Sequence, residues 1–320
     1  MMNLQEAARR AIEQCMGWKP EESILVVTDA PCRTVGLALF DVARQLTDRA
    51  LLLEYPPLPR NGAEPPSPVS SAMKRFQVVL APTSTSLTHT RARRKACEAG
   101  ARVGTLPGIS EEMMRRTMAA DYQEIAQRTY QLTRLLTEGK LARITSRAGT
   151  DIRVPIEGIR AIASTGLIHR PGQFGNLPSG EAYLMPREGE SEGVVVVDGS
   201  MAGIGLIEEQ PIRLVVERGM AVAVEGGREA RRLNEMLEAV GPKARNLAEL
   251  GVGTNHAARI TGAVLEDEKV MGTVHLALGN NASMGGTVTV PLHLDGVLRR
   301  PTLWVDDRLV LEEGRWMLGD

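Results

Sequence analysis

Short apolar runs alternate with amphipathic segments in the first third of the chain, and this alternation constrains the fold more than any other feature. Residues 23–28 (SILVVT) form the first run, and residues 32–48 carry apolar side chains at helical spacing. Further apolar runs occupy residues 50–54, 76–81 and 101–106. Strands that alternate with helices in this way predict a mostly parallel sheet covered by helices.

The character of the sequence changes near residue 140. From there on, short β-rich segments are separated by Gly, Pro, Asn and Asp, and residues 228–239 form the clearest helical segment. We therefore predict two domains. Residues 1–140 would form an α/β domain with a mostly parallel sheet, and residues 141–320 a β-rich α+β domain.

Charge and composition exclude several classes of protein. Lys plus Arg number 38 and Asp plus Glu 39, so the net charge of −1 gives no electrostatic reason to bind nucleic acid or an anionic membrane. No apolar run approaches the roughly 20 residues of a membrane span, and no apolar core of a signal peptide follows the N-terminus. Three separated cysteines, Cys15, Cys32 and Cys97, suit neither a disulfide framework nor a thiolate zinc site. We expect a cytoplasmic protein without nucleic-acid or membrane partners.

His293 and Asp295 are the first candidates for chemistry, because the sequence lacks a P-loop, a zincin motif and a nucleophile elbow. They occupy alternate positions of a strand-like segment, T-V-P-L-H-L-D at residues 289–295. Alternation places both side chains on one face of the strand. An imidazole and a carboxylate that project together suit a divalent metal. The spacing also fits a His–Asp hydrogen bond on a solvent-facing sheet, and both interpretations stay open at this point.

His275 and several acidic residues are weaker candidates. His275 lies among small residues on one face of T-V-H-L-A-L-G, which is equally typical of a core histidine. Glu249 precedes a Gly-rich turn and Glu181 follows a turn, and a single Glu in either place is normally solvated. One side chain of the acidic run at residues 266–268 could reach a site, although such a run is usually a solvated turn or helix start.

Together and in this order, these segments resemble the aminopeptidase T family of metallo-aminopeptidases. The resemblance is carried by L-P-S-G-E, A-E-L-G-V-G-T-N, L-E-D-E-K-V-M-G-T-V-H-L-A-L-G and P-L-H-L-D. It implies an α/β N-terminal domain, a catalytic metal-binding C-terminal domain and five metal ligands, which are Glu181, Glu249, His275, His293 and Asp295.

The resemblance also implies an activity. Two divalent ions (zinc, cobalt or manganese) would activate a bridging water that attacks a peptide carbonyl, and Glu249 would relay the proton to the leaving amine. The protein would then be a cytoplasmic hydrolase, a metalloprotease that removes N-terminal residues from small peptides. Classical relatives are dimers, so a homodimer is expected.

Two departures make this chain a short, divergent member. At 320 residues it is shorter than the classical enzymes, and residues 280–284 read N-N-A-S-M where the family carries a metal-ligating Tyr. A relative of similar fold, the iron-dependent 2,5-dihydroxypyridine ring-cleaving dioxygenase, also has an H-L-D segment. It uses a mononuclear iron site of two His and one carboxylate, with its second His where this chain has Glu249 and no counterpart of His275.

Because this chain has both Glu249 and His275, the sequence favours the hydrolase. The alternatives are a mononuclear Fe(II) dioxygenase similar to that relative and a non-catalytic descendant of the fold. Ligation by nitrogen and oxygen fits zinc, manganese, cobalt and iron alike.

Overall fold

The computed structural model describes residues 2–319, and their internal contacts form two compact units. Unit 1 comprises the residues up to Ala126 together with Ser164–Ser179, and unit 2 comprises the remainder. The chain thus passes between the units three times, whereas the sequence predicts one boundary near residue 140. The difference arises because helix α6 (Tyr122–Glu138) continues across the first crossing point, and because Ser164–Ser179 returns a strand to the first sheet.

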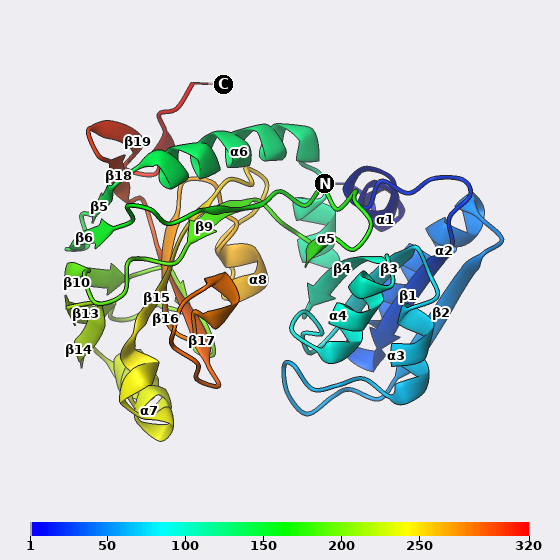
Figure 1. Cartoon of the computed structure of the whole chain (residues 1–320), viewed down its shortest axis with the longest axis horizontal. Helices are drawn as coiled ribbons and strands as arrows, with labels where there is room; N and C mark the ends of the chain where they lie inside the picture. The colour runs from blue at the N-terminus through cyan, green and yellow to red at the C-terminus, as the bar shows by residue number, and fades with distance from the viewer. Residues whose placement is uncertain (1, 320) are drawn as a thin grey trace. The chain divides into compact units, whose positions relative to one another are not determined.

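Unit 1 is built on a five-stranded parallel sheet, as the strand–helix alternation predicts (Figure 1). Its strand order is β2-β1-β3-β4-β8. Strands β1 and β3 are buried at every residue, which is typical of a parallel sheet with both faces covered. The strands are β1 (Ile24–Asp29), β2 (Ala50–Tyr55), β3 (Val78–Thr83), β4 (Arg102–Pro107) and β8 (Phe174–Asn176).

Side chains cap the first turn of three helices of unit 1. Asn3 and Glu6 form a reciprocal capping box on α1, and Thr90 and Ser110 cap α4 and α5. The helices are α1 (Leu4–Arg10), α2 (Arg33–Leu46), α3 (Ser67–Met73), α4 (Arg91–Glu98) and α5 (Glu111–Thr117), with a π-helical turn η1 (Ala11–Cys15) and a 3₁₀ turn η2 (Ala30–Cys32).

Unit 2 contains two antiparallel sheets (Figure 1). The eight-stranded sheet has the order β14-β13-β10-β6-β5-β18-β19-β20. Its strands are β5 (Leu141–Thr145), β6 (Asp151–Pro155), β10 (Glu192–Val197), β13 (Ile212–Glu217), β14 (Met220–Glu225), β18 (Thr302–Val305), β19 (Arg308–Glu312) and β20 (Arg315–Trp316).

The seven-stranded sheet has the order β12-β11-β17-β16-β15-β9-β7. Its strands are β7 (Ile162–Ser164), β9 (Glu181–Leu184), β11 (Ser200–Met201), β12 (Gly205–Leu206), β15 (Leu247–Gly253), β16 (Val274–Gly279) and β17 (His293–Leu298). Unit 2 also contains α7 (Arg228–Val240), α8 (Val264–Asp267) and the 3₁₀ turns η3 (Pro242–Arg245) and η4 (Ala282–Met284).

Alternation along the central strands divides the seven-stranded sheet into an apolar and a polar face. Leu250, Leu276 and Leu294 belong to one hydrophobic core with residues of the eight-stranded sheet, such as Ile144 and Val154. The residues between these leucines therefore project from the opposite face. This polar face of β15, β16 and β17 is where the candidate residues lie.

The structure thus confirms an α/β part with a parallel sheet and a second, antiparallel β-rich part. Among the helices of residues 2–319, none combines the length and the apolar character that crossing a membrane requires.

Candidate metal centre

Four neighbouring strands bring the predicted residues to one face of the seven-stranded sheet. Asp295 on β17 pairs with Ala277 on β16, which in turn pairs with Glu249 on β15. One step along, His275 on β16 pairs with Gly251 on β15. Glu181 on β9 lies on the other side of β15, where it pairs with Gly253. The same-face arrangement of His293 and Asp295 that the sequence predicts follows from their alternate positions on β17.

Two glycines of β15 make room for these side chains. A Cβ atom on Gly251 would lie 2.0 Å from His275 Nε2, so the imidazole occupies the space above this residue. A Cβ on Gly253 would lie 2.0 Å from the carbonyl oxygen of Val270. The segment that carries Glu268 and Lys269 can therefore approach the strand closely.

Glu249, His293 and Asp295 form one group of possible metal ligands, here called the His293 cluster. One ligand atom from each lies within 4.8 Å of the others. His293 Nε2 is 3.3 Å from Glu249 Oε2 and 3.4 Å from Asp295 Oδ1. The side chains of Glu249 and Asp295 are 10% and 9% exposed, whereas that of His293 is 32% exposed. The imidazole therefore marks the side of the cluster that small molecules can reach.

The hydrogen bond at the far side of the His293 ring orients the imidazole. Nδ1 lies 2.8 Å from the carbonyl oxygen of Asn280, which can only accept, so Nδ1 carries a hydrogen and donates it. In the neutral ring, Nε2 then presents its lone pair to the carboxylates of Glu249 and Asp295. The ring nitrogen and the two carboxylate oxygens are all electron-rich and would repel one another. A proton or a metal cation between them is therefore required.

The distances fit a cation. Charge-assisted hydrogen bonds between nitrogen and carboxylate are about 2.7–2.9 Å long. Ligand atoms about 2.1 Å from a common ion at 90–110° lie about 3.0–3.4 Å apart. The separations of 3.3 and 3.4 Å match the second case. Moreover, Asp295 Oδ1 is buried and accepts no hydrogen bond from any residue between 2 and 319. The residues of the His293 cluster thus fit a divalent metal.

Electrostatics show that this cluster attracts positive charge. Burial raises the pKa of Asp295, but His293, His275 and Lys269 lower it more, and the net pKa lies below its usual range. Burial lowers the pKa of His293, but Asp295 and Glu249 raise it more, to well above its ordinary value. The cluster therefore holds a proton tightly, and a metal ion that binds there displaces it.

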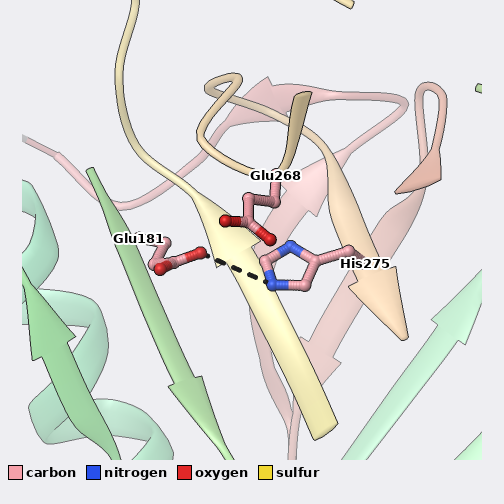
Figure 2. Close-up of side chains that lie close together, drawn as sticks. All are labelled: Glu181, Glu268 and His275. Atoms are coloured by element: carbon pink, nitrogen blue, oxygen red, sulfur yellow. Dashed lines mark ion pairs between the residues drawn. The ribbon is translucent and has the colours of Figure 1, made fainter. Parts of the chain in front are cut away.

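Glu181, Glu268 and His275 form a second group, here called the Glu181 cluster, and Figure 2 shows their side chains pointing toward one another. His275 Nε2 is 3.6 Å from Glu181 Oε2 and 3.4 Å from Glu249 Oε1, so this ring lies between the two clusters. Burial lowers the pKa of His275, but Glu249 and Glu181 raise it to about 9. Burial raises the pKa of Glu268 to about 8, although Lys269 opposes this rise.

Lys269 adds a permanent positive charge to this second group. Its side chain is 1% exposed, and Nζ donates to Glu181 Oε1 at 2.6 Å and to Glu268 Oε1. The two carboxylates raise the pKa of Lys269 more than burial lowers it, so the ammonium stays charged.

The structure brings all five predicted residues together, and it adds two that the sequence did not single out, Lys269 and Tyr183. Tyr183 shares the face of Glu181, since it pairs with Gly251, and burial and the charges of Glu181 and Glu249 raise the pKa of its phenol. The signals were weak, because Lys269 ends an ordinary acidic run and Tyr183 stands two residues after Glu181.

Of the acidic run, Glu268 alone belongs to a cluster. Glu266 accepts a hydrogen bond from the backbone of Arg259, and Asp267 accepts from Thr261 and Gly262. These two carboxylates hold the preceding loop.

Comparisons with known proteins identify the family. A family model described as NicX, 2,5-dihydroxypyridine 5,6-dioxygenase, matches residues 3–318. The 2,5-dihydroxypyridine 5,6-dioxygenase of Pseudomonas putida KT2440 is 27% identical over 192 residues, which cover 56% of this chain. The match spans 55% of that relative, about half of its length.

Two solved structures share the fold. The 2,5-dihydroxypyridine dioxygenase from Pseudomonas putida KT2440 gives a TM-score of 0.85 at 20% identity, over 99% of this chain and 97% of that one. AmpT from Thermus thermophilus gives a TM-score of 0.72 at 17% identity, over 99% of both chains.

These findings correct the resemblance drawn from the sequence. Assignment to the aminopeptidase T family was wrong, and so were the hydrolase, aminopeptidase and metalloprotease activities inferred from it. The segments that carried the resemblance belong to a fold that AmpT shares, whereas the family model matches almost the whole chain. The chain belongs to the NicX family, that of 2,5-dihydroxypyridine 5,6-dioxygenase.

Proposed function

We propose that this protein is a metal-dependent dioxygenase that opens the ring of a dihydroxylated pyridine, with dioxygen as co-substrate. The observation that carries the proposal is the match of a dioxygenase family model to residues 3–318, which include both clusters. The relative from Pseudomonas putida bears the name of the same activity.

Glu249, His293 and Asp295 would hold the metal ion, for which we propose Fe(II). Bound iron would supply the redox chemistry that joins dioxygen to an electron-rich aromatic ring, as in non-haem oxygenases with a facial group of three ligands. By the resemblance to the dioxygenase, Glu249 replaces one of two His ligands. The group then has one imidazole and two carboxylates, whose two negative charges balance one divalent ion.

The surrounding residues would orient these ligands. The Asn280 carbonyl holds the His293 ring with Nε2 toward the carboxylates, and His275 lies 3.4 Å from the other oxygen of Glu249. Such partners of metal ligands typically affect metal affinity or activity 10- to 100-fold, by the order of magnitude seen in other metal sites. Tyr183, whose phenol stays protonated, would be a hydrogen-bond donor on the same sheet face.

The test is oxygen consumption by protein purified without oxygen and loaded with Fe(II), with 2,5-dihydroxypyridine as substrate. We expect uptake of one dioxygen per ring opened, and both atoms of ¹⁸O₂ in the product by mass spectrometry. Monohydroxylated pyridines serve as negative substrates. If iron-loaded protein leaves 2,5-dihydroxypyridine intact, the proposed activity is wrong.

A matched pair of variants tests the site. His293→Ala is expected to abolish uptake and to lower iron affinity by more than about 10-fold, since it removes a ligand. His256→Ala is the control, because His256 is an exposed histidine of the same unit whose Nδ1 lies 3.1 Å from Arg128 Nη1. Equal loss in both variants would remove the site assignment.

A further inference from the structure

We infer that the ammonium group of Lys269 is the built-in cation of the Glu181 cluster and keeps a second metal ion out of that cluster. The inference rests on the metal centre of the proposed function, although not on ring cleavage. It concerns the number of metal ions bound per chain, and this number can be measured without an activity assay.

The position of Lys269 favours this role. The residue follows Glu268 in the turn between α8 and β16, and its side chain is 1% exposed. A buried lysine of this kind requires partners for its charge. Nζ has two of them, Glu181 Oε1 at 2.6 Å and Glu268 Oε1. Two of the three N–H donors of the ammonium are thereby used.

The fold holds Lys269 in place by backbone contacts. A Cβ on Gly253 would lie 2.7 Å from the carbonyl carbon of Lys269, so this segment packs directly against β15. The backbone N–H of Lys269 donates to the Glu266 carbonyl, and its own carbonyl accepts from Asn255. The backbone of Lys269 is therefore fixed against β15, and its side chain starts next to the Glu181 cluster.

The ammonium binds both carboxylates that a second metal ion in this cluster would need. Within the Glu181 cluster, one carboxylate oxygen of Glu181 and one of Glu268 already receive hydrogen bonds from Nζ. Of the other atoms, Glu181 Oε2 and His275 Nε2 are 3.6 Å apart, and Glu181 Oε2 is buried without a hydrogen-bond partner among residues 2–319. An ion held by that pair would lie only a few ångströms from the ammonium, and the two cations would repel each other strongly in this dry environment.

The His293 cluster differs in this respect. Its three residues have no Lys or Arg among the hydrogen-bond and ion-pair partners described for them in residues 2–319. One divalent ion there and one ammonium in the Glu181 cluster would give each group of carboxylates its own cation. The ligand roles predicted from the sequence for Glu181 and His275 stay predictions, and the stoichiometry below tests them.

The experiment counts metal ions per chain by elemental analysis. Purified protein is stripped with a chelator, incubated without oxygen with excess Fe(II), Mn(II) or Zn(II) alone, and freed of unbound metal. For the unaltered protein we expect close to one ion, lost in His293→Ala and retained in His275→Ala. Lys269→Met is expected to bind close to two, and the second is expected to be lost again in Lys269→Met/His275→Ala.

Two further variants serve as a second test of the charge and as a control. Lys269→Gln removes the charge but keeps a hydrogen-bond donor, so it offers a second route to a folded protein, and circular dichroism checks the fold of both. Lys243→Met is the control, because Lys243 is exposed in the η3 turn, and it should keep one ion.

Each outcome decides the matter. Two ions in the unaltered protein, or one ion in folded Lys269→Met and Lys269→Gln, would overturn the inference and leave the metal centre standing. No ion in the unaltered protein would overturn the metal centre as well. One ion that becomes two when the charge of Lys269 is removed supports the inference, whether or not 2,5-dihydroxypyridine is the substrate.

Discussion

His293 donates its Nδ1 hydrogen to the main-chain carbonyl of Asn280, 13 residues earlier and on the other side of the hairpin that joins β16 to β17. The Asn280 side chain fixes that carbonyl, since its Nδ2 donates to Val290 O and its Oδ1 accepts from Ala282 N. The position of a proposed ligand is thus set by the closure of one loop.

The first prediction concerns this loop. Asn280→Ala keeps the carbonyl that His293 needs but removes both side-chain bonds, so the loop should loosen. We expect metal affinity to fall about 10-fold, as for other indirect partners of metal ligands, while the fold persists. Titration with Mn(II), followed by calorimetry, measures the change. An affinity equal to that of the unaltered protein would show that the loop does not position His293.

A second prediction concerns Glu188, whose carboxylate accepts hydrogen bonds from the same loop. Glu188 Oε1 accepts from Asn281 Nδ2 and Thr287 N, and Oε2 accepts from Thr287 Oγ1. Glu188→Ala should raise the rate of backbone hydrogen exchange over residues 280–292, because these bonds are lost. Hydrogen-exchange mass spectrometry tests this, with residues 212–225 as the internal reference. Unchanged exchange at the loop would contradict it.

The third prediction concerns the space above β15. Gly251→Ala would bring a methyl group against the His275 ring, and overpacking of this kind typically costs about 1–3 kcal/mol of unfolding free energy. The double variant Gly251→Ala/His275→Ala should recover part of that loss, because the smaller side chain removes the clash. Urea unfolding of both single variants and the double variant gives the coupling energy. Strictly additive effects would show that the two residues do not compete for this space.

The fourth prediction concerns pH and unit 1. Arg102 and Glu22 form a buried ion pair with Nη2 and Oε2 2.6 Å apart. Burial raises the pKa of Glu22, but hydrogen bonds from Arg102 and Lys19 lower it more, so the net pKa is below its ordinary value. A carboxyl with a lowered pKa stabilises the fold above its unfolded pKa of about 4.3, and this contribution is lost as the pH falls through the folded pKa.

Glu22→Gln tests that sign. At pH 7 it should cost about 3–5 kcal/mol, since it leaves Arg102 buried without its counter-charge, and the difference from the unaltered protein should shrink below about pH 4. Glu138→Gln is the matched control, because the Arg134–Glu138 pair is exposed and such pairs contribute roughly 0–1 kcal/mol. Urea unfolding from pH 3 to 8 makes the comparison. A cost for Glu22→Gln that grows toward low pH would refute the argument.

Much of the architecture was predictable from periodicity. The buried strands β1 and β3 each begin with four apolar residues, and β17 alternates over His293–Asp295, so the parallel sheet and the shared face of His293 and Asp295 could be inferred. Strand β8 could not, because three residues are too few to show a pattern and two of them, Gly and Asn, are depleted in strands, so only pairing with β4 reveals it.

The residues of the candidate site could be predicted from the sequence, but the family of the protein could not. Glu249 and His275 suggested a hydrolase because local residue types reflect a shared fold, and a carboxylate pairs with a metal in many kinds of enzyme. The role of Lys269 could not be predicted from the sequence, for a different reason. Its ion pair with Glu181 spans 88 positions of sequence, and a lysine beside two acids is ordinarily solvated.

The return of Ser164–Ser179 to the first sheet has a practical consequence for anyone who wishes to express the two halves separately. A fragment that ends at residue 140 would lack β8 and leave β4 as a bare edge with unpaired main-chain groups, open to association with other strands. A fragment that begins at residue 141 would carry those residues as an unpaired stretch. Residues 164–179 must therefore accompany residues 1–126 whenever unit 1 is studied alone.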